Sequence, residues 1–299
     1  MKPRHGGETR FGVCGWDYRD WRGPLYPDPL PSGFRALPLL ACFLDYVEVN
    51  VTFYRIIPPG PAERWIEETP PSFTFVFKAW QGWTHDLVPP AGEELDGFRA
   101  LLAPAAAGGR LEGVLAQFPP GLSGEEDAFA RLLPLRDALL PHRLFAEFRH
   151  RALWREEVFA RLEREGIAFV NVDLPPVGTL PRPSRVNTGP VGMLRLHGRS
   201  RAGWSRPVDR DERYDHGYDR AECAELAGTI RELLDRCPRV LVGANNHFRA
   251  KAPAAAAMLA AELRGAPVAV PARLRAAFPE LAAVSVPLSE ESDGPAERP

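Results

Sequence analysis

Three side chains that can do chemistry lie within four positions of one another: Glu147, Arg149 and His150. They follow an apolar run, residues 144–146, that is typical of a buried strand. A carboxylate, a guanidinium and an imidazole are costly to bury unless they are paired, so a strand ending in them is poorly designed for stability alone. The same set suits an active site at the carboxyl end of a barrel strand. The segment therefore predicts a functional cavity.

Glu147 has two interpretations. It could be a general acid/base or a metal ligand, with His150 assisting. Alternatively, it forms an ion pair with Arg149 or across strands and holds the barrel rim together. Side chains alternate along a strand, so Glu147 and Arg149 share a face. If that face is the lumen, Phe148 points at the surrounding helices. If Glu147 is catalytic, Glu147→Gln abolishes turnover while the melting temperature holds.

The elements that would position these residues alternate along the whole chain. Apolar runs predict eight strands, at residues 11–15, 46–50, 73–78, 113–117, 143–148, 168–172, 191–197 and 240–244. Helices are predicted between them, at residues 34–44, 61–68, 93–107, 125–140, 154–165, 220–236 and 248–264. This order predicts a single-domain α/β protein, a parallel eight-stranded (β/α)8 TIM-type barrel over residues 11–284. We expect residues 1–10 to be a flexible N-terminus and residues 285–299 a disordered polar tail.

Bulk properties narrow the function. A net charge of −2 excludes a strongly basic nucleic-acid-binding protein, although a local patch remains compatible. No apolar run approaches the roughly 20 residues of a membrane span, and residues 1–10 do not resemble a secretory signal. The four cysteines are scattered without a CxxC pair, which indicates reduced thiols and a cytoplasmic protein. We interpret Cys14 as a buried thiol rather than a nucleophile.

In a barrel, the carboxyl ends of all strands meet at one mouth. Lys78 stands out there, because the basic residues are nearly all arginine and the other lysines are Lys2 and Lys251. It could be a base with a lowered pKa, a Schiff-base amine or a point charge for phosphate. The alternative is a salt bridge to Glu48 or Glu147.

We assign roles to the polar residues that these strand ends bring together. The predicted catalytic residues are Glu147 as acid/base, with Lys78 and His197. Lys78, Arg195 and His197 would bind or polarise an anionic centre. The predicted substrate-binding residues are Glu48, Asn50, Tyr54, His85, Gln117, Arg149, Arg195, Arg199, Asn245 and Asn246. If the cations pair with Glu48, Glu147 and Asp173, no positive surplus is left for an anion.

A divalent metal is the one cofactor considered, and no metal site is assigned. The oxygen and nitrogen donors that could bind zinc, manganese or magnesium are Glu48, His85, Glu147, His150, Asp173 and His197. The chain has no HxH, HxxxH or HExxH spacing, so His150 and Asp173 are only weak candidates. Glycine-rich phosphate loops of the Walker and Rossmann types are absent from the sequence.

Several short motifs carry a family resemblance. They are Cys14-Gly15-Trp16, Glu48-Val49-Asn50-Val51-Thr52-Phe53-Tyr54, Phe77-Lys78 with Thr84-His85, Gln117-Phe118-Pro119-Pro120, Glu147-Phe148-Arg149-His150, Arg195-Leu196-His197-Gly198-Arg199 and Asn245-Asn246. In this order, across residues 11–263, they resemble the DUF72 (YecE-like) family. The resemblance implies a TIM-type barrel of unassigned activity, comparable in fold to endonuclease IV-like metal hydrolases. Two positions depart from the family pattern, Val51 for a serine and His247 for an aspartate.

These observations favour an enzyme that uses acid/base chemistry on a small polar or anionic substrate, phosphorylated or sugar-like. A hydrolase is preferred to an isomerase or lyase by analogy of fold alone. One alternative is a protein that binds or processes nucleic acid, because residues 195–213 are rich in arginine and the mouth is aromatic. Another is a barrel that binds a small molecule without catalysis.

Overall fold

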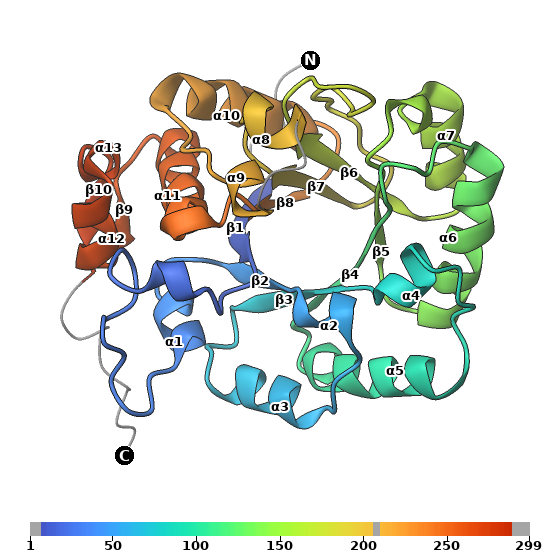
Figure 1. Cartoon of the computed structure of the whole chain (residues 1–299), viewed down its shortest axis with the longest axis horizontal. Helices are drawn as coiled ribbons and strands as arrows, with labels where there is room; N and C mark the ends of the chain where they lie inside the picture. The colour runs from blue at the N-terminus through green and yellow to red at the C-terminus, as the bar shows by residue number, and fades with distance from the viewer. Residues whose placement is uncertain (1–6, 206–209, 289–299) are drawn as a thin grey trace.

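Eight parallel strands form a closed barrel in the computed structural model, which describes residues 7–205 and 210–288 (Figure 1). Each strand pairs with the next in sequence, and the first pairs with the last, so the (β/α)8 prediction is confirmed. The strands are β1 (Glu8–Cys14), β2 (Tyr46–Val49), β3 (Thr74–Lys78), β4 (Leu111–Gln117), β5 (Leu144–Glu147), β6 (Ala168–Asp173), β7 (Val191–Leu196) and β8 (Arg239–Ala244).

Long helices surround the barrel and cover its outer face (Figure 1). The helices that follow β1 to β5 are α1 (Ala36–Ala41), α3 (Gly60–Glu67), α5 (Gly92–Ala107), α6 (Glu125–Leu139) and α7 (Glu156–Arg164). After β7 and β8 come α10 (Arg220–Leu234) and α11 (Lys251–Arg264). Local chemistry fixes some of their starts. Asp219 accepts a hydrogen bond from the Glu222 backbone, and the Glu222 side chain accepts one from Asp219, a capping box that begins α10.

Alternation along the strands divides the apolar residues into two cores. In β3, Phe75 and Phe77 belong to the outer core between sheet and helices, while Val76 belongs to a smaller cluster inside the barrel. The inner cluster also contains Leu115, Phe145, Met193 and Leu241 from other strands. Each fully buried aliphatic or aromatic side chain contributes about 1.5–3 kcal/mol of transfer free energy. The inner cluster closes the barrel below, and polar side chains occupy the inward positions nearest the carboxyl ends.

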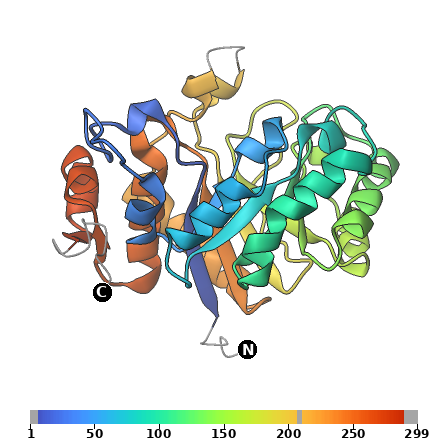
Figure 2. The ribbon, with the colours of Figure 1, turned by 90° about the horizontal axis from the view of Figure 1, so that it is seen from below.

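Short helical turns lie in the loops at the carboxyl ends of the strands, and the apolar periodicity predicted only the last of them, as the first turn of the helix over residues 248–264. They are η1 (Arg19–Trp21), α2 (Val51–Tyr54), α4 (Gln81–Thr84), η2 (Arg151–Leu153), α8 (Arg201–Ser205), α9 (Arg210–Arg213) and η3 (Phe248–Ala250). Figure 2 shows α8 and α9 projecting at this end, while β1 begins at the opposite end. These turns build the mouth of the barrel.

Both predicted flexible ends extend too far into the folded chain. Residues 8–10 belong to β1, because they pair with residues 239–241 of β8. At the other end, β10 (Ser285–Pro287) pairs with β9 (Val268–Val270), next to α12 (Ala272–Ala277) and α13 (Pro279–Ala282). Residues 1–6 and 289–299, which make up most of the rest of both predictions, lie outside the described residues. Among the helices that are described, none is long and apolar enough to cross a membrane.

Candidate active site

Arg195 lies at the centre of the mouth and is bound by two carboxylates. It points into the barrel because it lies two positions after Met193 of the inner cluster. Its Nε donates to both oxygens of Glu48 at 2.9 and 3.2 Å, and its Nη2 donates to Glu48 Oε2 at 2.7 Å. Its Nη1 donates to Glu147 Oε2. All three side chains are buried, so this cluster is an ionic floor beneath the mouth.

Glu147 is ion-paired with a second arginine. Arg149, on the same face of the chain, donates through Nε to Glu147 Oε1. Burial by itself raises the pKa of Glu147, but Arg149 and Arg195 outweigh burial and hold that pKa well below its usual range. Phe148 packs in the outer core, as the alternation predicts. The geometry is that of the ion-pair interpretation, and it disfavours Glu147 as a proton donor.

Both ring nitrogens of His197 have neighbours. Its Nδ1 lies 2.9 Å from Asn245 Nδ2, and its Nε2 lies 3.2 Å from Arg149 Nη2 and 3.5 Å from Glu147 Oε1. Burial, together with the charge of Arg149, lowers the pKa of His197 to about 3. His197 is therefore neutral and held in place at physiological pH, which suits positioning of Arg149 better than proton transfer.

Lys78 differs from the other charged groups of the floor. It faces the lumen two positions after Val76, and its Nζ donates to Gln117 Oε1 at 3.0 Å. The same nitrogen lies 3.8 Å from the centroid of the Phe53 ring. Among the described residues no carboxylate forms an ion pair with Lys78, so the predicted alternative of a salt bridge does not occur there.

Burial lowers the pKa of Lys78 from 10.5 to about 7, and the charge of Arg195 adds to the effect. The protonated and the neutral amine are therefore both populated near neutral pH. Perturbed groups of this kind in a concave site are candidates for catalysis. Cys14 differs from Lys78, because burial and Glu48 raise the pKa of its thiol well above the ordinary value. Cys14 therefore stays protonated, in line with its interpretation as a buried thiol.

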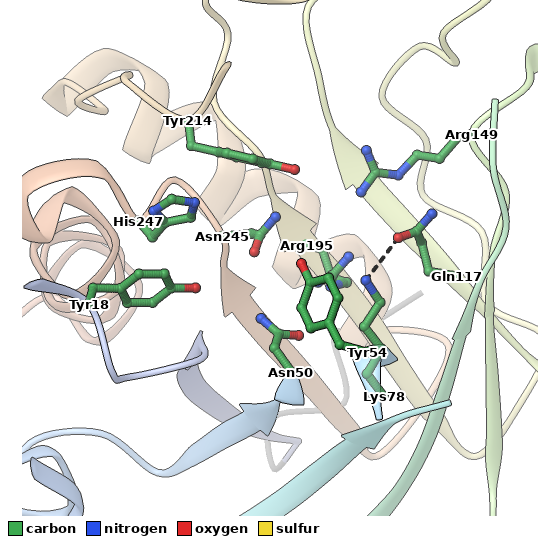
Figure 3. Close-up of a pocket in the computed structure, with 10 residues that line it drawn as sticks. All are labelled: Tyr18, Asn50, Tyr54, Lys78, Gln117, Arg149, Arg195, Tyr214, Asn245 and His247. Carbon is green, nitrogen blue, oxygen red and sulfur yellow. Dashed lines mark hydrogen bonds between the residues drawn. The ribbon is translucent and has the colours of Figure 1, made fainter. Parts of the chain in front are cut away.

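A cavity of about 50 Å³ lies above the ionic floor (Figure 3). Its lining is strongly polar and comes from seven of the eight strands or the loops that follow them. The lining residues are Tyr18, Asn50, Tyr54, Lys78, Gln117, Arg149, Arg195, Tyr214, Asn245 and His247. Seven of these ten are predicted substrate-binding or catalytic residues. Glu48, Glu147 and His197 lie beneath, in contact with the arginines.

Sequence reasoning assigned no role to three aromatic residues of the lining. The Tyr18 ring stacks on His247 with centroids 4.5 Å apart and planes 6° apart, and Tyr214 lies 4.8 Å from His247 on another side. Figure 3 shows the three rings together, across the cavity from Lys78. His247 replaces the usual family acid, and that departure was the one available signal. Tyr18 and Tyr214 reach the cavity through irregular loops, which periodicity does not describe.

Two groups at the cavity leave hydrogen-bonding capacity unused. Asn50 Oδ1 is buried and has no hydrogen-bond partner among the described residues. Arg149 uses Nε and Nη2 within the described structure, which leaves its Nη1 for the cavity that the side chain lines. A buried polar group without a partner is costly, so such groups indicate where a ligand binds.

Other predicted residues lie outside the cavity, because strand alternation turns them outward. Val172 faces the lumen, so Asp173 faces away from it. There Arg199 donates to Asp173 at 2.8–3.0 Å, and Tyr218 Oη donates to it at 2.6 Å. Asn246, next to the lumen residue Asn245, donates to the His216 carbonyl at 2.9 Å. Arg199, Asp173 and Asn246 therefore brace the loops around the mouth.

Two histidines also have local roles. His85 Nδ1 lies 2.8 Å from Thr84 Oγ1, and its ring packs edge-on against Phe53. His150 accepts a hydrogen bond from the Ala152 backbone at 3.2 Å and caps η2. Neither histidine lines the cavity.

The donor set does not fit a divalent metal. Within residues 7–205 and 210–288, no group of three or more His, Cys, Asp or Glu side chains is arranged to hold one. The carboxylates proposed as ligands, Glu48, Glu147 and Asp173, bind arginines instead. The two weak candidates for metal ligands have other partners: Asp173 is buried against Arg199, and His150 caps a helical turn.

Comparisons of the sequence and of the structure with known proteins point to the same family. A family model described as "Protein of unknown function DUF72" matches residues 10–279. The UPF0759 protein YunF of Bacillus subtilis is 29% identical over 252 residues, which cover 79% of this chain and 88% of that protein. A DUF72 family protein of Thermotoga maritima is similar in structure, with a TM-score of 0.73, 27% identity, and 86% of this chain and 98% of that one covered. A second, of Enterococcus faecalis, has a TM-score of 0.75 and 23% identity, with 86% and 95% covered, and supports the fold alone.

Proposed function

Because the chain belongs to the DUF72 family, which is described by no activity, we propose its function from the cavity itself. We propose an enzyme that moves a proton at a carbon of a small anionic substrate, next to its carbonyl or carboxyl group. The observation that carries the proposal is the amine of Lys78, which is partly buried and lines the cavity without a carboxylate partner among the described residues. An amine that is half neutral near pH 7 is matched to acid/base chemistry at that pH.

The charges around the cavity favour an anion. Arg149 and Arg195 are balanced by Glu48 and Glu147, so the positive charge of protonated Lys78 has no counter-ion in the floor. Arg149 Nη1 offers a further donor, and guanidinium groups bind carboxylates with good geometry. An anion in the cavity would balance the positive charge of protonated Lys78 and accept a hydrogen bond from Arg149.

The size of the cavity restricts the substrate. A volume of about 50 Å³ holds about four water molecules, at about 10–15 Å³ for each. The part of the substrate that reaches Lys78 therefore has only a few non-hydrogen atoms. Small 2-oxo and 2-hydroxy acids have this size and charge.

The predicted roles change in one respect. Glu147 orients Arg149 and Arg195 in this proposal, since its low pKa and two arginine partners leave it no proton to donate. Lys78 takes over the proton transfer. Hydrolysis is less well supported, because no carboxylate of the floor is available to activate water. The nucleic-acid alternative gains no support from Arg195 and Arg199, which bind Glu48 and Asp173.

Proton exchange with solvent tests the proposal. Pyruvate, lactate and similar small acids are incubated with the protein in D2O, and loss of the C–H signal is followed by NMR. We expect the wild-type protein to exchange at least one acid, and Lys78→Met to be slower by about 10²–10⁴-fold, the usual contribution of general acid–base catalysis. Lys251→Met is the matched control, because Lys251 pairs with Asp215 outside the cavity and its loss leaves exchange unchanged.

Titration of Lys78 tests whether its pKa lies near 7, on which the proposal depends. The chain has three lysines, so a protein labelled with ¹³C at lysine Cε gives few signals, and the Lys78 signal is the one lost in Lys78→Met. We expect it to titrate near pH 7. Equal exchange by wild type and Lys78→Met refutes the catalytic role. Tight binding of these acids without exchange supports a non-catalytic binding barrel instead.

A further inference from the structure

The contacts of the Lys78 amine determine where its nitrogen lone pair points. In the neutral amine, one N–H donates to Gln117 Oε1 at 3.0 Å, and the Phe53 ring 3.8 Å away faces a second. These two contacts leave the lone pair for the cavity that Lys78 lines. A desolvated lysine beside other cations is the usual form of a nucleophilic amine in enzymes.

No other group of the floor competes with this amine as a nucleophile. The oxygens of Glu48 and Glu147 accept hydrogen bonds from arginines, and Cys14 keeps its proton. The ring nitrogens of His197 lie against Asn245 and Arg149. Lys78 is therefore the nucleophile that this arrangement exposes to a ligand.

The remaining polar groups suit a carbonyl compound with a carboxylate. Figure 3 shows Arg149 and Lys78 on the same side of the cavity with Gln117 between them, so one small molecule reaches both. Arg149 Nη1 would bind the carboxylate, which places the adjacent carbonyl carbon toward Lys78 Nζ. Asn50 Oδ1, buried without a hydrogen-bond partner in the described structure, would accept from the hydroxyl that forms on the carbonyl oxygen.

We propose that Lys78 forms a covalent imine with the carbonyl carbon of a small 2-oxo acid. The neutral amine attacks the carbonyl carbon, a C–N bond forms, and the carbonyl oxygen takes up the proton that the nitrogen loses. The resulting hydroxyl group then takes the second proton of the nitrogen and leaves as water, so the C–O bond breaks and a neutral C=N bond forms. One water is released and no electrons are transferred. The inference rests on the proposed function in one respect, since both require the neutral amine of Lys78 in the cavity.

Reductive trapping tests the imine. The full-length protein is treated with glyoxylate or pyruvate and sodium borohydride, which delivers a hydride to the imine carbon. Peptide mass spectrometry then locates the added carboxyalkyl group. We expect at least tenfold more adduct on Lys78 than on Lys251, although the Lys251 side chain lies outside the cavity and is 26% exposed to solvent. Excess formate, which binds as an anion but has no ketone, should suppress the Lys78 adduct.

Two variants make the result specific. Arg149→Met should reduce the Lys78 adduct at low oxo-acid concentration, whereas Lys251→Met should not change it. Adduct that is equal on Lys78 and Lys251, or that formate does not suppress, overturns the inference. If Lys78 titrates near pH 7 and supports exchange but is never trapped, the imine fails and the proposed function stands. If the adduct forms without exchange, the imine stands and the proposed function fails.

Discussion

Replacing Glu147 by glutamine tests the ionic floor most directly. The carboxylate accepts hydrogen bonds from Arg149 and Arg195 and is fully buried. The amide that replaces it is nearly isosteric but neutral, so both guanidinium groups lose a counter-ion in a water-poor site. We therefore expect Glu147→Gln to destabilise the protein, in contrast to the unchanged melting temperature expected for a purely catalytic carboxylate.

The magnitude follows from the burial. Removing one partner of a buried ion pair costs about 3–5 kcal/mol. For a protein of this size, each kcal/mol lowers the melting temperature by about 2–4 °C, so the variant should melt roughly 6–20 °C below the wild type. Glu147 also raises the pKa of Lys78, so the same change should move the Lys78 titration below pH 7.

The assay is thermal and urea unfolding followed by circular dichroism, with Glu225→Gln as the control. Glu225 is 54% exposed and pairs with Arg199, so its replacement should cost less than about 1 kcal/mol. A lowered pKa means that the Glu147 contribution is present above about pH 4.3, its unfolded value, and is lost as pH falls through the folded value. The gap between wild type and variant should therefore narrow in acid. If Glu147→Gln melts within 1 °C of the wild type at pH 7, the account of the floor is wrong.

Three further changes have defined outcomes. Lys78→Met should stabilise the protein at pH 7, because a Lys78 pKa lowered from 10.5 to about 7 reduces the free energy of unfolding by roughly 4 kcal/mol at that pH. This destabilisation is complete below pH 7 and fades toward pH 10.5, so the unfolding curves of wild type and variant should converge as pH rises. Tyr218→Phe removes the donor to Asp173 and the acceptor of the Gly198 amide, and urea titration should show a loss of about 1–3 kcal/mol. Gly243→Ala would place a Cβ 2.6 Å from Glu48 Oε1, so calorimetry should show weaker binding of small carboxylates, and unchanged affinity would contradict the tight packing described there.

The alternation of predicted strands and helices along the chain was enough to predict the barrel. Eight strands and their helices follow from local periodicity, and the closed order of the strands follows from their number and their parallel connections. Alternation was also enough to pair Glu147 with Arg149 on one face and to send Phe148 to the other. These are properties of neighbouring residues, which sequence records directly.

The partners of each charge were decided by the tertiary structure alone. Arg195 binds Glu48, which lies 147 positions away in the sequence. Asp173 faces away from the lumen, because its neighbour Val172 faces the lumen, and it therefore binds Arg199 outside the cavity. The aromatic side of the cavity, Tyr18 and Tyr214, depends on two irregular loops that converge on the same histidine. The sequence thus determined seven of the ten residues that line the cavity, because alternation and strand length are local. Closure of the barrel decided which charges cancel and left Lys78 facing the cavity, because pairing and burial depend on distances between strands far apart in the chain.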